Sequence, residues 1–473
     1  MLFNSYEFLF AFLPLVFVLY WFCGRGVRWR MTVLALASYA FYAWWDWRFM
    51  LLMIVSTSTN YFAAKRMVRN ELSGDARHKR FWLIAPIVLN LSLLATFRYL
   101  GFFSRIASDL SQFLHGGTLP VIALVLPIGI SFYTFEAISY ITDVYRGVTR
   151  PARSFLEYAC FISMFPRLIA GPIVRYADLE QQFAAHRAGE FDQHVGPPAD
   201  HLRVGLMLLT MGMVKKVLIA DRLAAAISPW WGAASPISAA ESWAAVLGYT
   251  FQIYFDLSGY SDIAVGLAHL FGFRLPQNFD SPYKAADPID FWRRWHMTLS
   301  TWLRDYLYIP LGGNRTGHRT RNLMLTMLLG GLWHGAAWQF IAWGGWHGLL
   351  LVLTHRLKPQ RPKSQPGGWI ARQVTFAAVI VGWVLFRADG LGAAGRMYAS
   401  MFNLSRRMNA DSLAPAVLFA CALLWAWVNF VPNSFQIAYR IPERRRYAIM
   451  AGGALACCAI FFGTKTDFLY FQF

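Results

Sequence analysis

The stretch MLFNSYEFLFAFLPLVFVLYWFCGRGVRWR (1–30) indicates the class of fold to which this chain belongs. Its apolar run is preceded by one acidic residue, Glu7, and followed by the basic residues Arg25, Arg28 and Arg30. A secretory signal peptide would show a basic start and a small-residue cleavage site after the apolar run. The order in this chain instead predicts a retained membrane span whose basic end lies in the cytoplasm.

The rest of the chain has the same apolar character. Of its 473 residues, 57% are hydrophobic and 15% are charged, whereas soluble domains contain roughly 45–50% and 25%. Apolar segments of about 17–25 residues are long enough to cross a bilayer. Such segments begin near residues 8, 31, 49, 81, 119, 154, 203, 241, 322, 337, 370, 414 and 446. The pattern predicts an all-α, polytopic integral membrane protein with roughly a dozen transmembrane and re-entrant helices.

The net charge of +19 has two possible meanings. In a soluble protein it would indicate nucleic-acid binding, but here the charges gather in short loops such as 65–80, 355–363 and 440–446. Basic loops of this kind are typical of cytoplasmic segments that face anionic lipid. We therefore expect the lipid bilayer as a partner and no nucleic acid. The excess of Lys and Arg in alternate loops before residue 155 predicts a periplasmic N-terminus.

The cysteines and the repeat structure give little further information. The five cysteines lie in or beside apolar runs and lack metal-ligand spacing, so we expect no metal site and no disulfide framework. No repeat with a period of 20–50 residues is visible. A single integral-membrane domain over residues 1–473 is the simplest description.

One imidazole is placed unusually in the apolar stretch LLGGLWHGAAW (328–338). His334 is its only ionisable side chain, and such groups inside membrane segments are candidates for function. A neutral imidazole would be available as a base, although a structural histidine that donates to a carbonyl is an equal alternative. A second WHG follows at 346–348. In one continuous helix His334 and His347 would lie roughly 20 Å and about 140° apart. We therefore expect His347 to be a packing or interfacial residue, unless the chain bends at Gly344–Gly345.

The segment 270–321 is too polar to span a bilayer and too aromatic for a plain loop. An interfacial or re-entrant helix bounded by loops suits it better. Helical spacing would place Trp292 and Arg293 near His296, with Ser300 one turn further along. The guanidinium groups of Arg293 and Arg294 are suited to hold a phosphate or a carboxylate.

Two carboxylates, Asp256 and Asp262, lie in the apolar stretch 249–273. They could orient a histidine, bind a cation or line a polar tunnel, but polar pairing within a helix bundle is at least as good an explanation. We expect Ser258–Gly259 to break the helix between them.

Five blocks in a fixed order resemble the membrane-bound O-acyltransferase family. They are PIGISFYTFEAISYITDVYRG (127–147), FPRLIAGPIVRY (165–176), YFDLSGYSDIAVGLAHLFGFRLPQNF (254–279), DFWRRWHMTLSTWLRDYLYIPLGGN (290–314) and NLMLTMLLGGLWHGAAW (322–338). The resemblance implies an acyltransferase core at about 120–400, with helices around a central tunnel. It also implies that His334 and His296 are the catalytic residues. The predicted substrate-binding residues are Arg293, Arg294, Trp333, Asn278, Asp256 and Asp262.

The resemblance further implies a substrate class and a location. Similar members take acetyl groups from a cytoplasmic donor, for which acetyl-CoA is expected, and work with periplasmic acetyltransferase partners on exported polysaccharides such as alginate. No bound cofactor is expected, and the location is the bacterial inner membrane. The same architecture also serves cellulose acetylation and D-alanylation of a cell-wall polymer. A proton-coupled transporter and an inactive scaffold for an export complex are the alternatives from other classes.

Overall fold

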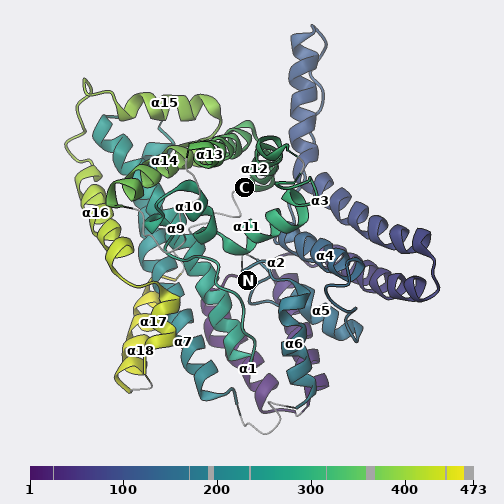
Figure 1. Ribbon diagram of the computed structural model, residues 1–473. Helices are drawn as coiled ribbons and strands as arrows, with labels where there is room; N and C mark the ends of the chain where they lie inside the picture. The colour runs from purple at the N-terminus through teal and green to yellow at the C-terminus, as the bar shows by residue number, and fades with distance from the viewer. Residues whose placement is uncertain are drawn as a thin grey trace. The chain divides into compact units, whose positions relative to one another are not determined.

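The computed structural model describes residues 1–24, 26–169, 171–189, 196–233, 236–315, 317–357, 368–442 and 445–462 (Figure 1). Every regular element in these residues is a helix, which confirms the predicted all-α class. Contacts within the chain define two units, residues 1–209 with 263–276, and residues 210–262 with 277–473. The helices α7 (Ala199–Met213) and α9 (Ala239–Leu270) contribute to both. The single domain expected from the sequence stays a prediction.

The first unit contains most of the N-terminal helices. Apart from its shares of α7 and α9, its elements are η1 (Glu7–Phe12), α1 (Leu13–Trp21), α2 (Val27–Leu72), α3 (Ala76–Phe113), α4 (Ile130–Tyr145), α5 (Phe155–Ser163) and α6 (Tyr176–Arg187). The first expected span forms the apolar helix Glu7–Trp21, which is shorter than 18 residues. The next two expected spans form α2, which is interrupted at Asp46 by extended backbone (φ −159°, ψ 110°).

Two boundaries in this unit differ from the sequence expectation. The side chain of Asp75 caps α3 by accepting from the His78 backbone N–H at 3.0 Å, and the helix then continues to Phe113. Residues 98–113, which lie toward the end of the apolar segment expected from about residue 81 and beyond it, are therefore helical. The span expected from about residue 119 begins only at Ile130, after Pro127 and Gly129. Proline cannot donate to a helix ladder, and Gly129 adopts a left-handed φ of 75°.

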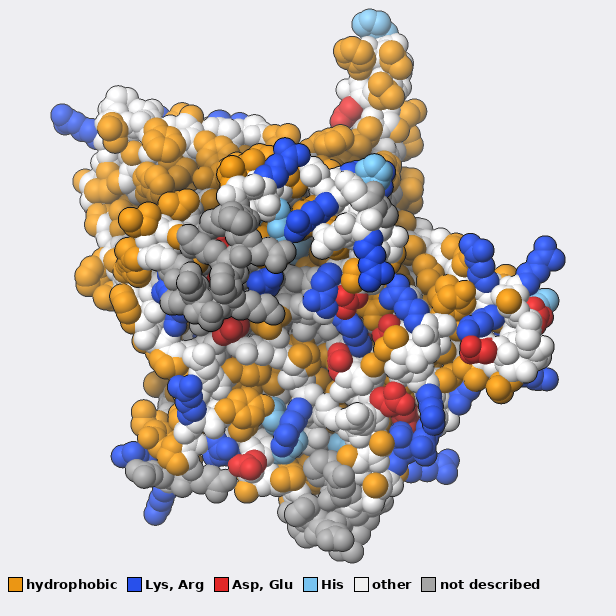
Figure 2. Space-filling model, in the orientation of Figure 1, with side chains coloured by type: hydrophobic (Ala, Val, Ile, Leu, Met, Phe, Trp, Pro, Cys, Tyr) orange, Lys and Arg blue, Asp and Glu red, His pale blue; other side chains and the backbone are white. Residues whose placement is uncertain are grey.

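Helix α3 has an exposed apolar surface. Phe81, Phe103 and Phe113 are 56%, 59% and 78% exposed, and Figure 2 shows hydrophobic side chains along the visible part of this helix. Among the described residues, α3 and α14 (Trp369–Arg387) pass a length and hydropathy test for a membrane span. The bent pair α16 (Ala414–Phe430) and α17 (Ser434–Arg440) also passes if it counts as one span. Fewer helices pass this test than the sequence predicted, because many are short or carry polar side chains.

Some of those polar side chains are paired inside the first unit. Glu136 on α4 forms a buried ion pair with Arg167, which lies in the connection between α5 and α6. The same carboxylate accepts from the backbone N–H of Val174 at 3.3 Å. A buried carboxylate needs such partners, because leaving one unpaired in an apolar interior is costly. The pair therefore holds the 165–176 block against α4.

The second unit contains the candidate site. In addition to its shares of α7 and α9, and to α14, α16 and α17, its elements are η2 (Val214–Ala220), α8 (Asp221–Trp231), η3 (Pro282–Lys284), α10 (Pro288–Arg294), α11 (Met297–Leu303), η4 (Arg304–Tyr308), α12 (Arg319–His334), α13 (Trp338–Leu357), α15 (Leu391–Met401) and α18 (Arg445–Ile460). Val246 of α9, Val384 of α14 and Met397 of α15 belong to one buried cluster. The 270–321 segment forms short helices joined by loops, as its mixed composition predicted.

Candidate active site

Helices α12 and α13 fold back on each other as a tight hairpin. Helix α12 ends at His334, Gly335 is extended, and α13 starts at Trp338. A Cβ added to Gly331 would overlap the carbonyl oxygen of Phe340, and one added to Gly344 would overlap that of Met327. The glycines thus let the two backbones approach closely, as small residues do between membrane helices.

This hairpin changes the expected relation between the two WHG histidines. The bend falls at residues 335–337 and not at Gly344–Gly345, and it replaces the continuous helix that would have separated His334 from His347. Both imidazoles contact the same indole, because the ring centroid of Trp343 lies 5.1 Å from that of His334 and 4.9 Å from that of His347. The two histidines therefore belong to one cluster.

The ring of His334 is enclosed by aromatic side chains. Its centroid lies 4.8 Å from Trp333 and 5.2 Å from Phe386 of α14, in addition to the contact with Trp343, and all three rings meet it edge-on. His334 is 7% exposed. The predicted substrate-binding residue Trp333 is thus a direct neighbour of the predicted catalytic imidazole.

His347 is more deeply buried than His334. It is 1% exposed, and its ring contacts those of Trp292 and Phe291 at centroid distances of 5.2 and 6.0 Å. Its Nε2 faces Gly382 of α14, where an added Cβ would lie 2.8 Å from that nitrogen. These contacts agree with the packing role expected for His347. The residue is buried among aromatic rings and does not lie at a membrane interface or other surface.

His296 does not lie on a continuous helix. Helix α10 ends at Arg294 and α11 begins at Met297, and between them His296 adopts a left-handed conformation (φ 44°, ψ 54°). The continuous helix expected to bring Trp292 and Arg293 next to His296 is therefore absent, but Ser300 does lie one turn further along, because its backbone N–H donates to the carbonyl oxygen of His296 at 3.0 Å. The ring of Phe279 lies 5.9 Å from that of His296, which is 3% exposed.

A row of rings connects the surroundings of the two predicted catalytic histidines. Trp295, which precedes His296, lies 4.8 Å from Trp383 of α14. Trp383 in turn lies 6.1 Å from Trp343, which contacts His334. Sequence alone does not single out Trp343, Trp383 or Phe386, because aromatic residues are common throughout this chain and their convergence depends on the fold.

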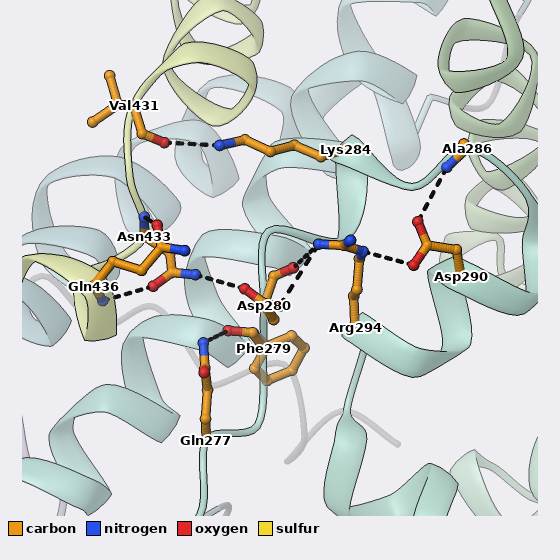
Figure 3. Close-up of polar contacts among 10 residues, drawn as sticks. All are labelled: Gln277, Phe279, Asp280, Lys284, Ala286, Asp290, Arg294, Val431, Asn433 and Gln436. Atoms are coloured by element: carbon orange, nitrogen blue, oxygen red, sulfur yellow. Dashed lines mark hydrogen bonds and ion pairs between the residues drawn. The ribbon is translucent and has the colours of Figure 1, made fainter. Parts of the chain in front are cut away.

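The two predicted substrate-binding arginines have different surroundings. Arg294 Nε donates to Asp290 Oδ1 at 2.8 Å, and its Nη1 lies 3.6 Å from Asp280 Oδ2, as Figure 3 shows. Asp280 also accepts from Asn433 Nδ2 at 2.8 Å, so Arg294 and Asn433 meet on one carboxylate. Arg293, in contrast, is exposed. Arg293 is therefore more available to a ligand than Arg294, whose guanidinium group is held by two carboxylates.

Asn278, a predicted substrate-binding residue, is 2% exposed. Its Oδ1 accepts from the backbone N–H of Thr298 at 3.2 Å and from the Thr298 hydroxyl at 2.9 Å. The side chain of Asn278 therefore contacts the start of α11 at Thr298, which is two residues after His296.

Asp256 and Asp262 both lie on α9 and both pair with lysines. Lys216 Nζ lies 2.5 Å from Asp256 Oδ1 and 2.9 Å from Asp221 Oδ1. Lys215 Nζ donates to Asp262 Oδ2 at 2.6 Å, and the hydroxyl of Ser434 donates to the same oxygen at 2.5 Å. The structural pairing that the sequence left open is therefore present, and the predicted role of both carboxylates in substrate binding stays a prediction.

Two sequence expectations about this region need correction. Helix α9 runs without interruption through Ser258–Gly259, which was expected to break it. Gly259 packs closely on another helix, because an added Cβ would lie 2.9 Å from the carbonyl oxygen of Gly212. Lys215 and Lys216, which form part of the π-helix η2, were not among the predicted site residues. Two adjacent lysines inside an apolar run were a usable signal, since ionisable residues in such segments are expensive.

We expect Asp262→Asn to lower the thermal stability of the protein. The change removes the charge that pairs with Lys215, and breaking a buried ion pair costs roughly 3–5 kcal/mol. Thermal unfolding of the purified protein in detergent should show a lower midpoint than the wild type. An unchanged midpoint would contradict a structural role for this pair, and a higher KM in the folded variant would support the predicted substrate role.

Comparison with known proteins identifies the class to which this fold and site belong. The sequence model of the membrane-bound O-acyltransferase family matches residues 150–388, which include α10 to α13 and both His296 and His334. The chain belongs to this family and is a polytopic membrane O-acyltransferase.

Several relatives have defined activities in their names. The chain is 44% identical over 407 residues to the probable alginate O-acetylase AlgI of Pseudomonas aeruginosa, which covers 85% of this chain and 75% of the relative. It is 37% identical to the peptidoglycan O-acetyltransferase of Helicobacter pylori, over 86% of this chain and 80% of that protein. It is 27% identical to the teichoic acid D-alanyltransferase of Bacillus subtilis, over 56% and 69% of the two chains.

Proposed function

We propose that this acyltransferase moves acetyl groups from acetyl-CoA in the cytoplasm across the inner membrane for O-acetylation of an exported polysaccharide. Alginate is the first candidate polymer, because the relatives named as probable alginate O-acetylases are 42–44% identical to this chain. A periplasmic acetyltransferase partner would pass the group to the polymer. Peptidoglycan and teichoic acid relatives show that polymer choice varies among similar chains.

One observation carries the proposal, namely the enclosed imidazole of His334 at the end of α12. Trp333, Trp343 and Phe386 surround this ring, and the site is largely shielded from water. A shielded base is useful in acetyl transfer because water would otherwise hydrolyse the activated acyl group. Family membership favours this chemistry over the transporter and the inactive scaffold.

The proposed reaction has balanced proton and bond changes. His334 removes the proton from the acceptor hydroxyl, whose oxygen attacks the thioester carbonyl carbon while the carbon–sulfur bond breaks. The thiolate that leaves takes the proton back from the imidazolium. In a two-step variant His334 itself accepts the acetyl group and then passes it to the acceptor. His296 would position the donor or stabilise the negative charge that develops on the carbonyl oxygen.

The polymer can be tested in the source organism. Mass spectrometry should find O-acetyl groups on the exported polysaccharide of the parent strain and their loss when this protein is deleted. Complementation with the wild-type chain should restore them. A deletion strain whose extracellular polysaccharides and cell wall keep all their O-acetyl groups would overturn the proposal.

We expect Arg293→Ala to weaken donor binding and Arg294→Ala to act differently. The exposed Arg293 can meet the phosphates of acetyl-CoA, so its loss should raise the KM for the donor about tenfold, or roughly 1.4 kcal/mol. Arg294 is held by Asp290 and Asp280, so its loss should mainly lower the amount of folded protein. Steady-state kinetics and membrane abundance of both variants separate the two effects. Equal KM values for Arg293→Ala and the wild type would contradict the donor role.

A further inference from the structure

The backbone on both sides of His296 pairs with the loop that precedes α10. The N–H of Asp280 donates to the carbonyl oxygen of Arg294 at 2.9 Å, and the N–H of Met297 donates to the carbonyl oxygen of Asn278 at 2.9 Å. In a regular antiparallel pair, the residue between such bonds would face one partner. Here Phe279 faces two residues, Trp295 and His296, which is the two-against-one arrangement of a β-bulge, although neither segment is a strand.

Side-chain contacts agree with this pairing. The ring of Phe279 lies 5.1 Å from that of Trp295 and 5.9 Å from that of His296. His296 has a φ of 44°, in the left-handed region that only a few per cent of non-glycine residues adopt. Surrounding contacts must therefore maintain it, and bulges near active sites commonly serve to re-aim a side chain.

Asn278 makes the contacts that hold the C-terminal side of the bulge. His296 is the N-cap of α11, but its side chain makes no capping hydrogen bond. The Oδ1 of Asn278 acts as the cap instead, because it accepts from the backbone N–H and the hydroxyl of Thr298. The backbone carbonyl oxygen of Asn278 accepts from the N–H of Met297. A side chain from another segment thus satisfies a donor that helix formation leaves free.

A second set of contacts holds the N-terminal side. Asp280 binds the backbone of Arg294 through its own N–H, and its carboxylate lies between Arg294 and Asn433, as Figure 3 shows. Asn433 in turn caps α17 by accepting from the Gln436 backbone N–H at 3.0 Å. The loop 278–280 is therefore anchored independently of α11, and it provides a fixed support for His296.

We propose that Asn278 is a positioning residue for His296, which it fixes in one orientation by closing the bulge and capping α11. The proposal rests on the catalytic role proposed above for His296. If Asn278 positions His296, its replacement should lower kcat. If Asn278 bound substrate directly, its replacement should raise KM.

The test compares two substitutions at Asn278 in the full-length protein, with acetyl-CoA as donor. Asn278→Leu keeps the size but removes the acceptor, and it should lower kcat about tenfold or more while the KM for acetyl-CoA changes less than about twofold. Asn278→Asp keeps an acceptor and should retain most of the activity. Gln277→Ala is a matched control, because the Gln277 side chain donates to Phe279 O in the same loop and makes no hydrogen bond to the described residues of α11.

A double-mutant cycle separates positioning from a general loss of stability. If Asn278 acts through His296, adding Asn278→Leu to His296→Ala should cause no further fall in kcat. Additive losses, or a tenfold rise in KM without a fall in kcat, would overturn the proposal. If Asn278→Leu does not accumulate, Thr298→Val serves in its place, because it removes the hydroxyl donor to the same oxygen and should show the same non-additivity.

The outcomes also distinguish this inference from the proposed function. If His296→Ala is impaired and Asn278→Leu has wild-type kcat, the positioning role fails and the catalytic role of His296 survives. If His296→Ala is fully active, both fail. If the wild-type protein transfers no acetyl group from acetyl-CoA, the proposed donor is wrong.

Discussion

Replacement of His334 by alanine is expected to lower acetyl transfer at least 100-fold without loss of the protein from the membrane. General base catalysis contributes roughly 10²–10⁴ to a rate, and no other imidazole in the described residues has the same three neighbours Trp333, Trp343 and Phe386. The protein should persist because His334 is the last residue of α12 and its loss breaks no helix. Radiolabelled acetyl transfer by the purified variant, normalised to folded protein, gives the measurement.

His347 is the matched control for this experiment. It also contacts Trp343 and is 1% exposed, so His347→Ala removes an imidazole from the same cluster and opens a cavity. We expect less folded protein but a much milder loss of activity per folded molecule. Equal losses per molecule in the two variants would contradict the placement of the reaction at His334, and near-normal transfer by His334→Ala would remove it from the mechanism.

The second large effect is expected at Gly331, one of the positions where the backbones of α12 and α13 approach closely. The Cβ of Gly331→Ala would overlap the carbonyl oxygen of Phe340, and a backbone atom cannot turn aside as a side chain can. Overpacking costs roughly 1–3 kcal/mol in protein interiors. A separation of the hairpin would also move His334 from Trp343, so stability and activity should fall together. Thermal unfolding in detergent and transfer assays on the same preparation test this.

Gly345→Ala provides the comparison for the hairpin prediction. Gly345 lies on the same helix, but its added Cβ would meet only Leu328 Cδ2 at 3.6 Å, an ordinary contact distance. The substitution should leave the unfolding midpoint and the activity near wild type, since alanine is also the better helix former. A Gly331→Ala variant as stable as Gly345→Ala would show that the close packing is unimportant.

The sequence predicts the class of this protein better than the lengths of its helices. Apolar composition was sufficient to indicate an all-α membrane protein, because few other folds need so little charge. It could not show that α3 continues to Phe113, since the residues from 98 onward are as compatible with a helix as with a loop. It also placed a break at Ser258–Gly259 where close packing on Gly212 explains the glycine.

In the candidate site, too, the sequence predicts some features and misses those that depend on the fold. His334 was identifiable because an imidazole is conspicuous among leucines and tryptophans. The shared neighbour of His334 and His347 depends on a bend at 335–337, which local composition did not distinguish from a bend at Gly344–Gly345. The conformation of His296 depends on hydrogen bonds to Asn278 and Asp280 from an earlier loop. Such long-range pairing is invisible to helical spacing, which is why the expectation of a continuous helix from Trp292 through His296 was wrong.

Acetyl transfer across a sealed membrane is the decisive test of the role proposed for His334. The purified protein is reconstituted into liposomes with radiolabelled acetyl-CoA on one side and the acceptor, with its periplasmic partner, on the other. We expect the acceptor to become labelled with the wild-type chain and to stay unlabelled with His334→Ala. Labelling that is equal in the two preparations, or that occurs only when donor and acceptor share a compartment, would contradict it.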